Sequence, residues 1–467
     1  MAMPTALHPV NELPTGEPHA PHERLVYDPP PEYAPRAAHV LHPAETREFE
    51  YKNDKKGETI ASLKILAPAA YSKHIPTFYG AGPVKGSAYL HLTEPETITS
   101  VVLSVRGQFS PGHSDSLERL VLFDITKTLW SKDSAEAATD PSFSHHKLSG
   151  THSWPFSISI PERVQSVGDG SGSAPGATDH VLPQTYNERI LSASIQYQVI
   201  LHIGRGKFSP DYEIPCTFGY IPLTEPPPFP PLKTVAYQER TPLLGPTVDV
   251  DGWVSAKKIN ISGTLFNSHP VAIECQLFLS APLVYTRGSV IPLYMRMQSS
   301  NQQALDLLAT NKSLTVRLQR RIEYSLPMRH LKDTDNYHAG KDERDLGEAV
   351  WWPDPSQGYN EFAANTQTHT ICLNGELHLR HDLAPSTTLP AFTIEYNVCL
   401  HSVNAPGFNM VKTPVEKSLL GHPVDIVTLF APGPRSVRYG PSRDDEDRPL
   451  VMEFGMAFGP LSNPLPG

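Results

Sequence analysis

The sequence predicts an all-β protein that folds into two domains. Its 467 residues exceed the roughly 250 to 300 residues at which one hydrophobic core stops growing. Its 48 prolines outnumber its 30 glycines, and proline favours strand edges, turns and extended tails. Apolar residues recur mostly at every second position, and helical periodicity is scarce. These features favour β-sandwiches or barrels over a doubly wound parallel sheet.

Strands with one buried face are expected in both halves of the chain. In the first half, apolar residues alternate with mostly polar neighbours over Val101–Phe109 and over Leu191–Ile203. In the second half the same alternation occurs in LTVRLQ and in FTIEYNVCL, Phe392–Leu400. The one short helix with a clear pattern is NQQALDLLA, Asn301–Ala309, whose apolar side would pack on a sheet.

The strand VAIECQLFL, Val271–Leu279, gives the most specific burial prediction. Its alternation predicts that one face lies in the core and the other outside it. The expected core face consists of Val271, Ile273, Cys275, Leu277 and Leu279. The expected outer face consists of Ala272, Glu274, Gln276 and Phe278.

Proline-rich and charged segments suggest the domain boundaries. Five prolines lie within Pro226–Pro231 and favour a stiff, extended linker, although they could also bind a proline-reading module. The expected organisation is a disordered proline-rich tail at 1–44, a β-sandwich at 45–223, the linker at 224–247, a second β-sandwich at 248–430 and a disordered tail at 431–467. Within the second sandwich, the polar stretch 329–367 is interpreted as a long insertion.

Charge and cysteine content exclude several classes of protein. The formal charge of -10 and a pI near 6.1 provide no basic footprint for nucleic acid. No signal-peptide pattern and no run of about 18 apolar residues is present, so we expect an intracellular chain. The four cysteines are widely separated, which is typical of reduced thiols in a core rather than of disulfides or nucleophiles.

No catalytic or metal-binding pattern is found. His145, His146 and His152 lie close together in the sequence, but no carboxylate or cysteine accompanies them at ligand spacing, which favours exposed loop histidines. Hydrolase, metalloprotease, phosphate-loop and dinucleotide-binding motifs are missing. We therefore expect no enzymatic activity, no cofactor and no metal.

A short proline motif gives the first functional hypothesis. Within DPPPEYAP, the residues Pro30, Pro31 and Tyr33 form a Pro-Pro-x-Tyr tetrapeptide. A WW domain binds such a peptide because the prolines are already extended and the tyrosine fills an adjacent groove. The alternative is that the tetrapeptide is an accident of a proline-rich tail.

A basic stretch gives a second hypothesis. Arg317, Arg320 and Arg321 lie close together in LTVRLQRRIEY and could contact acidic lipid headgroups or an acidic cytosolic tail. The sequence favours the plainer interpretation, in which these residues form the solvated face of a strand.

A series of stretches in the chain also follows a recognisable order. The first half contains FYGAGPVKGSAYLHL, VVLSVRGQF, LFDITKTLW and LSGTHSWPFSISIP. The second half contains VDVDGWVSAKKINISGTLFN, LSAPLVYTRGSVIPLYMRM and QALDLL. In order and spacing, these stretches resemble the N-domain and C-domain of arrestins as found in the α-arrestins of fungi. The resemblance covers roughly residues 45 to 430 and depends on the shared order of the stretches.

The resemblance implies two immunoglobulin-like antiparallel β-sandwiches and a trafficking adaptor without catalytic activity. Many α-arrestins link membrane transporters or receptors to HECT-type ubiquitin ligases, whose WW domains bind Pro-Pro-x-Tyr segments. It therefore implies a ligase partner for Pro30, Pro31 and Tyr33, and a cytoplasmic protein peripheral at the plasma membrane or endosomes. In the family such motifs usually follow the second domain, often in several copies, whereas here a single copy precedes the first domain.

Two alternatives remain open. One is an endocytic or signalling scaffold of the same fold that recruits no ligase. The other is a β-sandwich hydrolase or lectin-like binder with a site on its loops.

Overall fold

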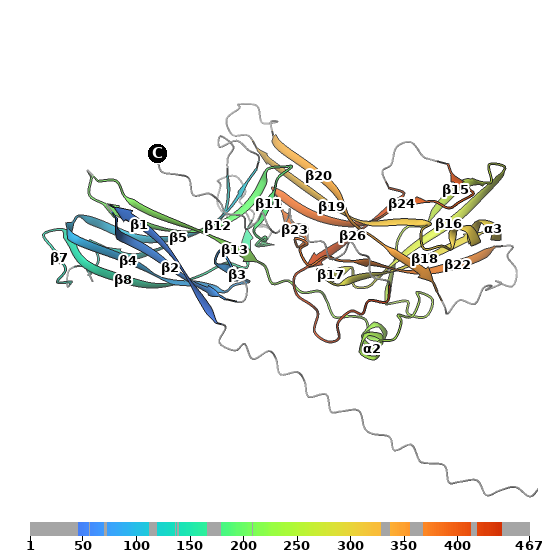
Figure 1. Cartoon of the computed structure of the whole chain (residues 1–467), viewed down its shortest axis with the longest axis horizontal. Coiled ribbons are helices and arrows are strands. Elements are labelled where there is room, and N and C mark those ends of the chain that lie inside the picture. Colours follow the sequence, from blue (N-terminus) through green and yellow to red (C-terminus); the bar gives the residue numbers. More distant parts are fainter. Residues whose placement is uncertain are drawn as a thin grey trace, which may run out of the picture. The chain divides into compact units, whose positions relative to one another are not determined.

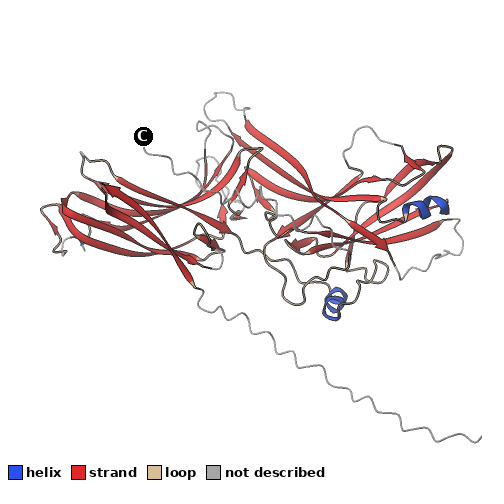
Figure 2. Cartoon of the chain, in the orientation of Figure 1, coloured by secondary structure: helices blue, strands red, loops and turns tan. Residues whose placement is uncertain are grey.

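A computed structural model describes residues 45–440 except 56, 70–71, 112–118, 136, 138–139, 166–178, 208, 328–336, 355–367 and 412–417. Strands dominate this part of the chain, as Figure 2 shows. Every sheet is built either from strands that end by Ile221 or from strands that begin at Trp253. The prediction of an all-β protein with two β-rich halves is confirmed.

The first half contains two large sheets, many of whose strands are labelled in Figure 1, and a small strand pair. One sheet has the order β1 (Thr46–Lys55), β2 (Glu58–Pro68), β4 (Pro83–Glu96), β8 (Lys147–Ser159) and β7 (Phe143–Ser144). The other has the order β3 (Thr77–Tyr79), β13 (Tyr212–Ile221), β12 (Ala193–Arg205), β5 (Ile98–Ser110) and β6 (Leu120–Ser131), with β11 (Tyr186–Glu188) paired to β12. The small pair joins β9 (Arg163–Gln165) to β10 (Asp179–Val181).

The second half also contains two large sheets. One has the order β21 (Val350–Pro353), β22 (His369–His378), β18 (Val290–Ser299), β16 (His269–Ser280), β15 (Ile259–Leu265) and β25 (Phe408–Met410), with β14 (Trp253–Ser255) on β16. The other has the order β17 (Val284–Thr286), β26 (Leu420–Val427), β24 (Phe392–Val403), β19 (Leu314–Pro327) and β20 (Tyr337–Glu348), with β23 (Thr387–Leu389) on β24.

The two halves repeat one topology although the sequence shows no internal repeat. In each half a three-residue strand, β3 or β17, pairs in parallel with the last long strand, β13 or β26. The Tyr197 hydroxyl donates to the Pro183 carbonyl at 2.6 Å, and Tyr396 in the matching strand donates to Ala384 at 2.7 Å. Tyr197 on β12 thereby attaches the segment that precedes β11, and Tyr396 on β24 attaches the segment that precedes β23.

The core face predicted for Val271–Leu279 is confirmed within β16, where all five alternate residues are buried. The prediction that Phe278 lies outside the core is wrong. Phe278 is buried beside Tyr294, with their ring centroids 6.1 Å apart, and Trp253 packs against the same cluster. The cause is β14, which pairs with the end of β16 and brings Trp253 onto its outer side.

Within the predicted linker, the expectation of an extended chain is wrong over α2 (Pro231–Glu239), which is a helix. Proline at the first helical position removes no intrahelical hydrogen bond and has a suitable φ. The second helix, α3 (Gln302–Leu308), confirms the expected helix and buries Ala304, Leu305 and Leu308.

The interpretation of 329–367 as an insertion is also wrong where β20 and β21 occur. The polar sequence of β20 suits an edge strand that pairs with the arginine-rich β19.

The expectation of reduced core thiols is confirmed, since all four cysteines are free and buried.

Candidate functional site

The Pro-Pro-x-Tyr motif lies outside the described residues. The structure therefore gives no geometry for Pro30, Pro31 and Tyr33. Their assignment as a partner-binding segment stays a prediction from the sequence.

The basic stretch lies on β19, and its three arginines have different surroundings. Leu318 and Ile322 are buried on one face of this strand, and Arg320 lies between them at the same parity. Arg320 is 1% exposed, so it is not available to an external acidic partner. The hypothesis of an accessible patch is wrong for Arg320, because alternation along the strand directs its side chain inward.

Arg320 belongs to a buried ionic cluster that joins the two halves. Its guanidinium Nη2 lies 3.1 Å from Glu188 Oε2, on β11 of the first half. The other Glu188 oxygen accepts from Arg344 on β20 at 2.9 Å. Asp342 completes the cluster, 2.8 Å from Arg344 and 3.8 Å from Arg320. Two arginines and two carboxylates balance one another, as buried charges require.

Aromatic contacts beside this cluster also cross between the halves. Tyr186 donates to Glu188 at 3.1 Å, and its ring centroid is 5.9 Å from that of Phe392. Phe109 on β5 packs against Phe392 with centroids 5.1 Å apart. Because the side chains of Arg320 and Glu188 are 0% and 5% exposed, the loss of either partner leaves a buried charge without compensation.

Arg317 and Arg321 are partly exposed, but both already have carboxylate partners. Arg317 lies 3.2 Å from Asp345 and 3.1 Å from Glu348. Arg321 lies 2.5 Å from Glu323. These intramolecular pairs compensate much of the positive charge on this face, so contact with an acidic partner stays a prediction for these two residues.

The sequence reasoning missed Glu188, Asp342 and Arg344. Arg320 itself carried a signal, since the alternation in LTVRLQRRIEY places it among the apolar positions. A charged residue at such a position indicates a buried ion pair. No local pattern identified its partners, because Glu188 is 132 residues away and the stretch that contains Asp342 was interpreted as a polar insertion.

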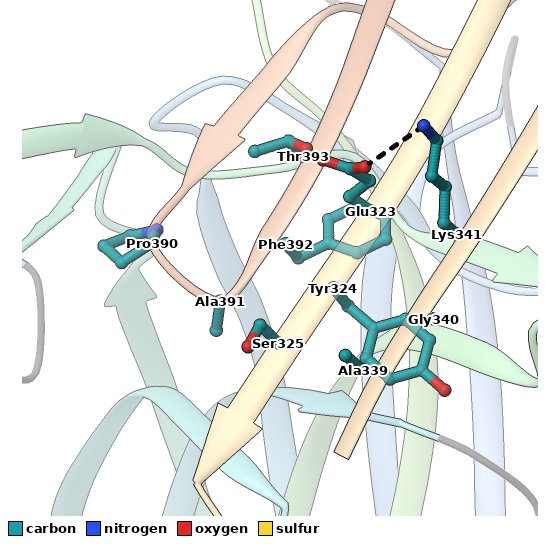
Figure 3. A pocket seen from close by; sticks show the side chains of 10 residues that line it. All are labelled: Glu323, Tyr324, Ser325, Ala339, Gly340, Lys341, Pro390, Ala391, Phe392 and Thr393. Atoms are coloured by element: carbon teal, nitrogen blue, oxygen red, sulfur yellow. Dashed lines mark ion pairs between the residues drawn. The ribbon is translucent and has the colours of Figure 1, made fainter. Parts of the chain in front are cut away.

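A pocket of about 390 Å³ lies beside the same strands (Figure 3). Its aromatic lining comes from Tyr324 and Phe392, and Glu323 and Lys341 form an ion pair at 3.8 Å at its edge. The remaining lining residues are Ser325, Ala339, Gly340, Pro390, Ala391 and Thr393. None of the described residues that line it is a histidine or a cysteine.

The cysteines and histidines show no reactive arrangement within the described residues. Burial raises the pKa of the Cys216 and Cys275 thiols to about 12, which keeps them protonated and poorly nucleophilic. His145 and His146 are exposed in the turn between β7 and β8, and His152 stacks on Trp154. No group of three or more potential metal ligands occurs among the residues that were placed.

The described helices are too short and too polar to cross a membrane. In comparisons with known proteins, no family model and no curated protein matches the chain.

Proposed function

We propose that this protein is a non-enzymatic adaptor of the arrestin type, which links membrane transporters or receptors to a HECT-type ubiquitin ligase. Pro30, Pro31 and Tyr33 would bind a WW domain of the ligase, and the two β-rich halves would contact cytosolic regions of the membrane protein. Ubiquitination and endocytosis of that membrane protein would follow.

The motif Pro30-Pro31-Glu32-Tyr33 carries this proposal, because its chemistry specifies one class of partner. The motif precedes β1, the first strand among the described residues, in the sequence. The duplicated two-sheet topology supports the arrestin-like interpretation, since each half repeats the same strand order. The ionic cluster around Glu188 supports it further, because an adaptor that presents two domains to one partner benefits from a defined contact between them.

A second function is favoured by one observation, the single copy of the motif ahead of the first domain. Avidity from several copies is not available to one short peptide, so binding to a ligase would be weak. The second candidate is therefore an endocytic or signalling scaffold of the same fold that recruits no ligase.

Proximity labelling in the native cell distinguishes the two candidates. The intact protein and its Tyr33→Ala variant would carry the same labelling enzyme. For the adaptor, a HECT-type ligase is enriched with the wild type and lost with the variant, while membrane proteins are enriched with both. Enrichment of membrane proteins without any ligase would favour the scaffold.

A further inference from the structure

Helix α2 buries its basic residue and exposes aliphatic ones. Lys233 is 3% exposed, and its ammonium nitrogen donates to the Ala281 carbonyl at 2.8 Å. The same nitrogen lies 4.7 Å from the centroid of the Phe229 ring. On the outward face, Leu232 and Val235 are each 45% exposed. The buried face of α2 also holds Ala236 and Tyr237, so Leu232 and Val235 form a second, exposed apolar face of the kind that another segment covers.

The connection after the helix carries further exposed aliphatic residues. Val248 and Val250 are 65% and 70% exposed in the turn that leads to Gly252. The Gly252 carbonyl accepts from the Ala281 N–H at 2.8 Å, so this turn is attached to the residue that also holds Lys233. We define the α2 patch as Leu232, Val235, Leu244, Val248 and Val250.

The described chain ends next to this patch. The Tyr439 hydroxyl donates to the carbonyl of Thr241, which lies two residues beyond the end of α2. The backbone N–H groups of Tyr439 and Gly440 each donate to the Glu376 carboxylate at 2.9 Å. Glu376 is 1% exposed, so the chain is held firmly at this point.

The sequence after Gly440 supplies an apolar segment at a suitable distance. Residues 441–449 read PSRDDEDRP, and residues 450–458 read LVMEFGMAF. The nine intervening residues can span about 30 Å when extended, whereas a nine-residue helix such as α2 is only about 14 Å long. A segment tethered in this way has a local concentration on the order of millimolar.

We propose that residues 450–458 dock on the α2 patch of the same molecule. Phe454 and Phe458 are the largest side chains of the segment and cover the exposed aliphatic residues of the helix. The tether favours this occupant over a second copy, which would have to bind at its bulk concentration. The proposal does not depend on the ligase-adaptor function, since it concerns only contacts within one chain.

Photocrosslinking of the intact protein tests the proposal. The probe is p-benzoylphenylalanine in place of Val235, and mass spectrometry maps the crosslinked peptides. The matched control carries the same probe in place of Val121, which is 41% exposed on β6. A mixture of isotope-labelled and unlabelled protein separates intramolecular crosslinks from those between two copies.

Docking predicts intramolecular crosslinks from position 235 to residues 450–458 and few from position 121. The double variant Phe454→Asp with Phe458→Asp should lower the yield from position 235 at least about tenfold, because both anchors are lost. Ser462→Asp, outside the segment, should leave the yield unchanged. Equal yields from both probe positions, crosslinks that join labelled to unlabelled copies, or an undiminished yield in the double variant would each overturn the proposal.

Discussion

Arg320 and Glu188 form an ion pair at 3.1 Å although they come from different halves of the chain. Their side chains are 0% and 5% exposed, and Arg344 shares the same carboxylate. Burial removes water from both charges, so their mutual attraction must offset the free energy lost on desolvation. The contact therefore matters more for how the halves associate than an exposed ion pair would.

We predict that Glu188→Gln destabilises the protein by about 3 to 5 kcal/mol, because the buried Arg320 loses the counter-charge that it shares with the partly exposed Arg344. Denaturant unfolding measures this loss. The matched control is Arg163→Met, which removes a pair to Asp179 whose side chains are about half exposed. The control should cost less than about 1 kcal/mol.

The double variant Glu188→Leu with Arg320→Met extends this test. Removing both charges should cost less than the sum of the two single changes, because neither charge is then left buried alone. Additive losses, or a Glu188→Gln variant that unfolds like the wild type, would show that the cluster does not couple the halves.

Alternation predicted the strands of this fold well, and it failed where a distant segment covers a surface. The five core positions of β16 follow from period two alone. Phe278 lies on the opposite face and is buried, because Trp253 and Tyr294 pack beside it. That contact depends on β14, which pairs with β16 from outside its local sequence.

The candidate site was less predictable than the fold. The inward position of Arg320 could be predicted from its neighbours in β19, whereas its partner Glu188 could not, because only the folded chain brings the two strands together.

Helix α2 was missed for another reason. The prolines before Leu232 favour an extended chain, yet Pro231 occupies the one helical position at which proline is well tolerated.

We expect Leu277→Asp to destabilise the second half by several kcal/mol, because Leu277 is 1% exposed and the substituted carboxylate would have no partner. Thermal unfolding measures the effect. Ala272→Asp is the control, since Ala272 is an exposed residue on the other face of β16. Equal melting temperatures for the two variants would contradict the register of this strand.

Lys233 should make stability depend on pH. Burial lowers the pKa of its ammonium group from 10.5 to about 7. Between these two values the unfolded chain binds the proton and the folded chain does not, so the contribution of Lys233 to stability rises with pH from about 7 to 10.5. Below pH 7 both states are protonated, and this contribution stays constant.

Urea unfolding at pH 7.5 and pH 9 measures this effect as a difference between the wild type and Lys233→Met. The wild type should gain up to about 1.4 kcal/mol per pH unit relative to the variant. Taking the difference removes the contributions of cysteines and tyrosines, which both proteins share. A difference that is flat over this range would mean that Lys233 is already charged in the folded protein.

Arg317 and Arg321 should contribute little to binding at acidic membranes. A free basic residue near an anionic surface gains roughly 1 kcal/mol, but both guanidinium groups already have carboxylate partners on the protein. Sedimentation with vesicles that contain phosphatidylserine should show less than about a threefold loss for the double variant Arg317→Gln with Arg321→Gln. Neutral vesicles are the control, and a loss of tenfold or more confined to the acidic vesicles would restore the patch as a membrane contact.

Tyr33 should supply much of the affinity for a WW domain. Short proline ligands bind on the order of micromolar, which corresponds to about 8 kcal/mol. Tyr33→Ala removes an aromatic anchor, which typically costs at least about 2 kcal/mol, so the affinity should fall by roughly thirtyfold or more. Tyr27→Ala is the matched control, because Tyr27 lies in the same proline-rich segment but outside the tetrapeptide.

Calorimetric titration of the full-length proteins against WW domains of a HECT-type ligase measures the affinities. Thermal unfolding should be the same for the wild type, Tyr33→Ala and Tyr27→Ala. Equal binding by wild type and Tyr33→Ala, or no binding by the wild type, would identify the tetrapeptide as an accident of composition and favour the scaffold that recruits no ligase.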